Sequence, residues 1–191
     1  AAHENTILDQ IKQQLLTYDQ TPEDCYSLIK FIETITNDAS RSMVDLNEIA
    51  VKCYFHPETQ GRTSIKKVLP AVLQTSGLLK EKYSKPIGDN SSSLNFPDTF
   101  VWFQERGSKA VDPYELLKRH TIDLFNETNP SISHENYLIA EGGAAAMAYA
   151  RLQFEDLGNQ ERSNIKDALL RYCELDTLAM VMVLRAWMEL S

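Results

Sequence analysis

Apolar and polar positions alternate with a helical period in the first third of the chain. Apolar residues recur every three or four positions between residues 3 and 18 and again after residue 21, which predicts two amphipathic helices. Thr21 and Pro22 are residue types favoured at a helix N-cap and first position, so we place the second start there. Asn37 and Asp38 favour turns and mark its end. We expect the two helices to pack antiparallel.

The pattern is less regular in the next segment. The apolar run 43–46 fits either a buried strand or the start of a helix that continues to Cys53, and we favour a brief strand that leads into a helix. Thr63 and Ser64 then cap a further helix, whose apolar positions run through residues 65–73. Pro70 lies inside this helix and lacks a backbone donor, so it should bend or split the helix.

The helical pattern disappears between about residues 84 and 108. Polar and turn-forming residues fill the first part of this segment, which predicts a long mobile loop. The second part contains side chains that are too apolar to remain in water, so we expect them to anchor the loop either to the domain or to surface that is missing from this chain. These side chains are Phe96, Phe100, Val101, Trp102 and Phe103.

Two helices of different character follow. Residues 112–113 are an Asp-Pro pair that opens a short helix, and the Asn-Pro-Ser sequence at 129–131 marks a second loop. Small residues dominate the stretch 142–152. Because alanine favours helix and permits close packing, this stretch predicts a buried helix.

The last helix has the strongest pattern. Apolar residues at helical spacing run from Ile165 to Trp187, and we start this helix at Ser163 or Asn164. The elements together predict a mainly α-helical chain with one or two short strands. We expect residues 1–191 to form a single domain.

Composition limits the classes of function. The formal net charge of -8 repels a phosphate backbone overall, so any nucleic-acid contact must be local. The three cysteines are widely spaced and the four histidines lack metal-binding spacing, which argues against a disulfide framework and a zinc site. This cysteine usage fits a reducing, cytoplasmic setting. No apolar run approaches the roughly 20 residues of a membrane span, so we expect no membrane partner.

One compact basic cluster accompanies the capped helix that begins near Ser64. Arg62, Lys66 and Lys67 lie where a phosphate would meet both positive charge and free backbone N–H groups. They are therefore our candidates for nucleic-acid contact. The alternative is a solvated helix face, which is common for lysine.

Tyr172 and Asp176 form the candidate chemical site. They are four residues apart, so they share one face of the last helix with apolar neighbours. A carboxylate in such a stripe needs a hydrogen bond, a cation or a metal ion. Mg²⁺ and Mn²⁺ accept oxygen ligands, and a tyrosine hydroxyl could orient an attacking water. The alternative is an ordinary tyrosine–carboxylate hydrogen bond. For Cys173, beside them, we expect a packed thiol.

The run Ala168–Val181 around this pair resembles the C-terminal motif of a bacterial domain-of-unknown-function family with a DnaQ-like, RNase H-like exonuclease fold. Three other stretches resemble that family in the same order, and together they cover most of the chain. They are Met43–Leu46 with Tyr54–Pro57, Gly61–Pro70, and Gly142–Met147.

The resemblance implies an α/β fold of the RNase H-like type and a metal-dependent nuclease of the DEDDy type. Such enzymes hold two Mg²⁺ or Mn²⁺ ions with four carboxylates and hydrolyse phosphodiester bonds from a three-prime end. Asp176 would be the last metal ligand and Tyr172 the water-orienting hydroxyl. Glu4 resembles the middle acid and would be a second ligand; alternatively, it is simply an acid in a first helical turn.

The first-strand Asp-x-Glu pair of that family has no counterpart in this sequence. The chain therefore resembles a C-terminal portion, and we expect it to be inactive alone and to bind no metal tightly. Apolar surface left where the sheet belongs would favour a homo-oligomer. The alternative function is a non-catalytic helical interaction module, in which Asp176 is a satisfied polar group and the loop around Trp102 docks a partner.

Overall fold

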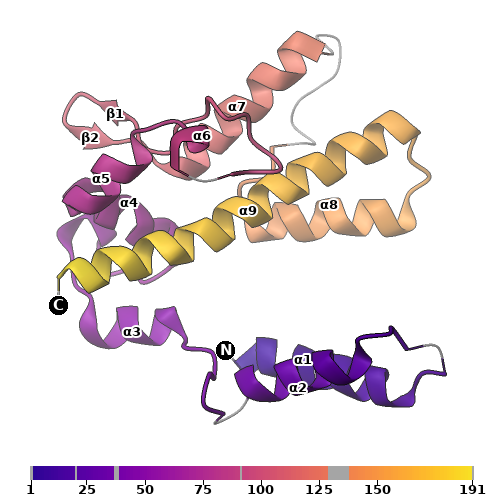
Figure 1. The fold of residues 1–191 in the computed structure, drawn as a ribbon. Helices are drawn as coiled ribbons and strands as arrows, with labels where there is room; N and C mark the ends of the chain where they lie inside the picture. The colour runs from indigo at the N-terminus through magenta and orange to yellow at the C-terminus, as the bar shows by residue number, and fades with distance from the viewer. Residues whose placement is uncertain (1, 20, 37–38, 91, 129–137, 191) are drawn as a thin grey trace. The chain divides into compact units, whose positions relative to one another are not determined.

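The computed structural model describes residues 2–19, 21–36, 39–90, 92–128 and 138–190 (Figure 1). Its contacts divide the chain into two compact units, Ala1–Lys52 and Cys53–Ser191, and each is described by itself. The described residues are mainly helical, with one two-stranded sheet, which confirms the mainly α-helical prediction. The single domain over residues 1–191 stays a prediction, because the two units are not placed relative to one another.

The N-terminal unit begins with two helices that lie side by side, as expected: α1 (Ala2–Thr17) and α2 (Cys25–Ile35). The second helix starts later than Thr21 and Pro22 suggest. The carbonyl of Pro22 accepts a hydrogen bond from the Cys25 N–H at 3.0 Å, which forms a separate turn before the helix. Asp24 therefore occupies the N-cap position.

Helix α3 (Leu46–Cys53) replaces the strand that we favoured for residues 43–46. The prediction of a strand there is wrong, and the prediction of a helix through Cys53 is confirmed. Asp45 explains the difference, since its carboxylate accepts the N–H of Asn47 at 2.9 Å. This contact satisfies an otherwise unpaired donor at the helix start, so the helix begins at Leu46, while residues 43–45 are in neither helix nor strand.

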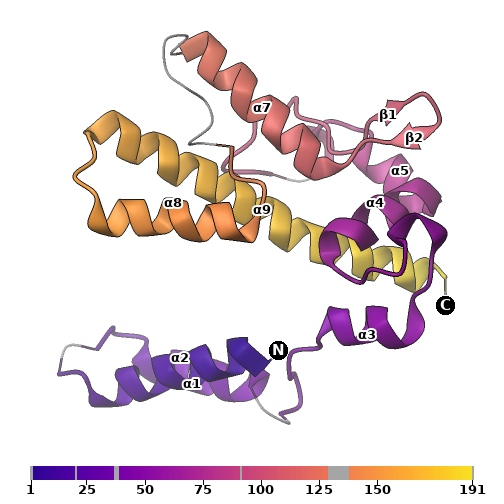
Figure 2. The same ribbon diagram turned by 180° about the vertical axis from the view of Figure 1, so that it is seen from behind.

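The C-terminal unit is built around the long helix α9 (Asn159–Glu189). Figures 1 and 2 show α8 (Gly142–Phe154) lying along the first half of α9, with α4 (Ile65–Thr75) and α5 (Gly77–Tyr83) near its second half. Helix α7 (Pro113–Thr128) also packs against α9. The side chains that α9 buries recur every three or four residues, which keeps them on one face. They are Ile165, Ala168, Tyr172, Leu175, Ala179, Met182, Val183 and Ala186.

Helix boundaries in this unit differ from the expected ones. Helix α9 starts at Asn159 rather than at Ser163 or Asn164, because its first turn is polar and carries no apolar period. Helix α7 has 16 residues and is not short. The loop expected at 129–131 lies outside the described residues.

Helix α4 continues through Pro70, so the helix is not split there, and a bend at Pro70 stays a prediction. The missing donor of a proline inside a helix costs about 3 kcal/mol. Five neighbouring apolar side chains are buried, and full burial of one large apolar side chain contributes about 1.5–3 kcal/mol. Packing of this face therefore outweighs the local cost of Pro70. The five side chains are Val68, Leu69, Ala71, Val72 and Leu73.

Helix α8 confirms the helix expected from the small residues, but not its burial. Only Ala148 and Leu152 are buried among its described residues, whereas Met147 is 68% and Tyr149 60% exposed. The small side chains pack one face against α9 and leave the opposite face in solvent. A run of alanines predicts helix through its backbone preference, but it does not specify how many faces are covered.

The segment expected to be a long loop contains two short elements, α6 (Ile87–Asn90) and the strand β1 (Glu105–Arg106). Its aromatic residues pack against the domain, which confirms the first of the two anchoring alternatives. The Phe96 ring lies 4.7 Å from the Trp102 ring and 5.4 Å from the His120 ring of α7, centroid to centroid. Trp102 is only 3% exposed. The mobility of this segment stays a prediction.

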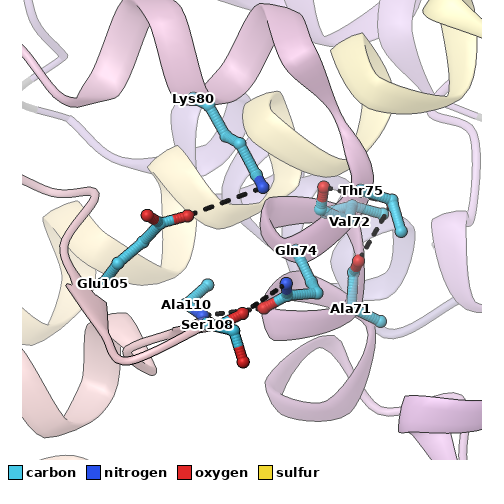
Figure 3. A network of polar contacts seen from close by, with 8 residues as sticks. All are labelled: Ala71, Val72, Gln74, Thr75, Lys80, Glu105, Ser108 and Ala110. Atoms are coloured by element: carbon cyan, nitrogen blue, oxygen red, sulfur yellow. Dashed lines mark hydrogen bonds and ion pairs between the residues drawn. The ribbon is translucent and has the colours of Figure 1, made fainter.

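A glutamine holds the β-hairpin against α4 (Figure 3). Strand β1 pairs antiparallel with β2 (Lys109–Ala110). The Gln74 amide donates to the Ser108 carbonyl at 3.0 Å and accepts the Ala110 N–H at 2.7 Å. These two contacts join the hairpin to the helical core through one side chain.

Candidate functional site around Asp176

Asp176 lies where three helices of the C-terminal unit meet. Tyr172 precedes it by one turn on α9, and Tyr114 reaches it from the first turn of α7. The Tyr114 hydroxyl donates a hydrogen bond to Asp176 Oδ1 at 2.5 Å, and Tyr172 is also hydrogen-bonded to this carboxylate. Both tyrosines are buried, whereas Asp176 is half-buried. The carboxylate is thus fixed by two phenol groups and still reaches solvent.

Local sequence explains how Tyr114 arrives at this position. Asp112 accepts the backbone N–H of Tyr114 at 3.0 Å, and Pro113 occupies the first position of α7. The hydrogen bond from Tyr114 to Asp112 and the proline at the first position both favour a helix start here. Tyr114, Leu117 and Thr121 then form one buried face of α7. The Tyr114 ring packs 6.4 Å from the Tyr172 ring, centroid to centroid.

Lys66 is the fourth functional group at this position. Its ammonium donates to the Ala140 carbonyl at 2.6 Å and lies 4.9 Å from the Tyr114 ring centroid. It also lies 5.5 Å from the Tyr172 ring centroid. A cation over aromatic faces is attracted by their negative quadrupole. We call Lys66, Tyr114, Tyr172 and Asp176 the Asp176 cluster.

The basic cluster expected from the sequence is therefore divided. Lys66 is half-buried and belongs to the Asp176 cluster, whereas Arg62 and Lys67 are exposed. The structure brings Lys66, Tyr172 and Asp176 together, although they were expected to form two separate sites.

Burial and the neighbouring Asp176 carboxylate raise the pKa of both tyrosines above the ordinary tyrosine value. Burial raises the pKa of Tyr114, and the hydrogen bond to Asp176 and the charge of that carboxylate raise it further. The same three causes raise the pKa of Tyr172, again with burial as the largest. Both hydroxyls therefore act as stable hydrogen-bond donors to Asp176.

The Asp176 cluster fits a metal ion only in part. Asp176 offers oxygen ligands of the kind that Mg²⁺ and Mn²⁺ prefer. Within the described ranges, however, no three His, Cys, Asp or Glu side chains come together in a metal-binding arrangement. Asp176 could offer one ligand, and further acids would have to complete such a site.

Glu4 was expected to be such an acid. It lies in the first turn of α1, is exposed, and belongs to the N-terminal unit. Because the two units are not placed relative to one another, a pairing of Glu4 with Asp176 stays a prediction.

Two further residues differ from expectation. Cys173 is exposed rather than packed, because it lies on α9 one position beyond the buried face. Tyr114 was not recognised from the sequence. The signal that could have identified it is the spacing Tyr114–Leu117–Thr121, which marks the buried face of α7.

Comparison of the chain with models of protein families, with curated proteins and with solved structures gave no significant match. Among the helices that the structure describes, none combines the length and the apolar character needed to cross a bilayer.

Proposed function

We propose that the Asp176 cluster is part of a metal-dependent nuclease site of the RNase H-like type, which hydrolyses phosphodiester bonds. Asp176 would supply one ligand to Mg²⁺ or Mn²⁺. The single observation that supports this proposal best is the half-buried Asp176 carboxylate, held by Tyr114 and Tyr172 beside the Lys66 ammonium.

Each member of the cluster has a role in this proposal. Tyr114 fixes the carboxylate, because its hydroxyl is buried and donates to Oδ1. Tyr172 remains protonated and orients water with its hydroxyl. Lys66 places a positive charge where a phosphate would approach. A bound ion would lower the pKa of a coordinated water and so generate the nucleophile.

The test is Mn²⁺ binding to the 191-residue chain, followed by paramagnetic broadening of backbone amide signals. We expect weak binding that broadens the signals of residues 172–176 first, because one carboxylate gives a weak site. Asp176→Asn should abolish this broadening, whereas Asp167→Asn should retain it. Asp167 is a matched control, since it is an exposed acid on the same helix. Broadening that is unchanged in Asp176→Asn would refute the proposal.

One observation favours the alternative, a non-catalytic helical module. Tyr114 already satisfies Asp176 Oδ1, so the carboxylate has a structural role without any ion. Trp102 cannot itself form the docking surface, because it is buried in the aromatic cluster of the loop. Under this alternative the chain shows no Mn²⁺-dependent broadening at Asp176, and Asp176→Asn only lowers stability.

A further inference from the structure

A groove with a volume of about 640 Å³ runs along α9, on a face next to the Asp176 cluster. The segment between α5 and Trp102 forms its other wall. Residues at its two ends show how the groove is oriented along α9. At one end, Asn95 donates to Glu174 at 2.6 Å and its carbonyl accepts from Arg171 at 3.2 Å. At the other end, Tyr83 and Arg185 both line the groove.

The groove is long for its volume. Its lining on α9 extends from Leu170 to Arg185, which is about 22 Å at the helical rise of about 1.5 Å per residue. A volume of this size lies in the range of sites for small molecules, about 300–1,000 Å³. The space is therefore elongated, and it suits a single chain-like molecule better than a compact one.

The lining of the groove is mostly apolar. Leu170 and Val181 are exposed on its α9 side, and Leu94 on the opposite wall is 99% exposed. Covering these side chains would remove apolar surface from water, at about 25 cal/mol per Å². A ligand with a long apolar part would gain this free energy.

The cations that line the groove lie at one end of it, whereas Arg171, which donates to the Asn95 carbonyl at the other end, does not line the groove. Lys82, Lys85 and Arg185 are these lining cations, and the Lys82 ammonium lies 5.6 Å from the Tyr83 ring centroid. Glu174 is the only acid among the described residues that line the groove, and it is tied to Asn95 at the other end. The protein as a whole carries a charge of -8, so these cations form a local exception.

This distribution argues against single-stranded nucleic acid as the occupant. Such strands need aromatic faces for stacking and positive charges along their whole path. Here Trp102 and Tyr83 are buried, and the cations that line the groove are gathered at one end. An apolar chain with one negatively charged end matches both features.

We propose that this groove binds an elongated apolar molecule with one anionic head group, of the chemical class of long-chain carboxylates. The head group pairs with Lys82, Lys85 and Arg185. The apolar chain runs along α9 and covers Leu94, Leu170 and Val181.

Isothermal titration of the 191-residue chain with laurate, below its micelle concentration, tests this site. We expect saturable binding of one molecule. Arg185→Glu should weaken it about tenfold, because an attraction becomes a repulsion at the charged end. Lys109→Glu makes the same change of charge at an exposed lysine outside the groove, and should leave the affinity unchanged. Leu94→Ser should weaken binding about threefold, through lost apolar contact.

Three results would overturn the proposal. The first is no saturable binding of laurate, as expected if another part of the protein covers the groove. The second is equal binding of dodecyltrimethylammonium, which has an apolar chain of similar length and the opposite charge. The third is equal weakening by Arg185→Glu and Lys109→Glu, which would show only a general effect of net charge. Circular dichroism of each variant establishes that the helices are retained.

Discussion

Removal of the Tyr114 hydroxyl tests whether the hydrogen bond to Asp176 stabilises the C-terminal unit. Tyr114→Phe keeps the buried ring and deletes only the donor to Asp176 Oδ1. A hydrogen bond to a charged group contributes about 1.5–3 kcal/mol. Because Asp176 is half-buried, water can replace part of the contact, and the lower end of this range applies. We expect a loss of about 1.5 kcal/mol in the free energy of unfolding.

Urea unfolding followed by tryptophan fluorescence measures this loss. Both tryptophans, Trp102 and Trp187, belong to the C-terminal unit, so the signal reports that unit alone. Tyr149→Phe is the matched control, since Tyr149 is exposed on α8 and should change stability by less than about 0.5 kcal/mol. A Tyr114→Phe variant as stable as this control would refute the structural role of the hydrogen bond. A double-mutant cycle with Asp176→Asn should give a coupling of about 1 kcal/mol.

The same variant has a signature at high pH. The pKa of Tyr114 and of Tyr172 is raised in the folded state, so the unfolded chain loses these protons first as the pH rises. The stabilisation is complete below about pH 10, the ordinary tyrosine value, and decreases as the pH rises above it. Each such tyrosine contributes a slope of up to about 1.4 kcal/mol per pH unit. Tyr114→Phe should therefore make the alkaline decrease in stability shallower, and an unchanged slope would contradict this account.

Two further predictions concern contacts that hold elements of the C-terminal unit together. Ser76 caps α5 and donates to Glu189 of α9. Ser76→Ala should therefore lower the free energy of unfolding in urea by about 1–2 kcal/mol. Ser84→Ala, at an exposed position, should lower it little. Gln74→Ala removes both contacts to the hairpin, so hydrogen exchange of the Ala110 amide should become faster. Gln104→Ala is the control, because Gln104 is exposed, and it should leave this exchange rate unchanged. Equal exchange in these two glutamine variants would show that Gln74 does not hold the hairpin.

Apolar periodicity predicts which segments are helical, because the faces that it marks are the faces that pack. It does not predict boundaries set by polar turns. The first turn of α9 from Asn159 and the turn after Pro22 both show this. The two-residue strands β1 and β2 are too short to carry an alternating pattern, so their position could not be predicted.

The sequence predicted only the part of the candidate site that lies on one helix. Tyr172 and Asp176 share a face because they are four residues apart, and helix geometry alone requires this. Tyr114 is 62 residues away in sequence, so its contact with Asp176 depends on how α7 packs. Lys66 was interpreted as a surface cation, although Leu69 and Leu73 at i+3 and i+7 place it on the buried face of α4. The Lys66 side chain is long enough to extend beyond these apolar neighbours, and its ammonium lies over the rings of Tyr114 and Tyr172.

Helix α9 carries the two candidate sites on neighbouring faces, so each can be tested without the other. Asp176 and Tyr172 point towards α7, whereas Leu170 and Arg185 line the groove. Asp176→Asn changes no residue that lines the groove, and Arg185 lies about 13 Å along the helix from Asp176 at the helical rise. At that separation the energies of the two variants should add. If Asp176→Asn weakened laurate binding as much as Arg185→Glu does, the two faces would have to move together, and α9 itself would couple the sites.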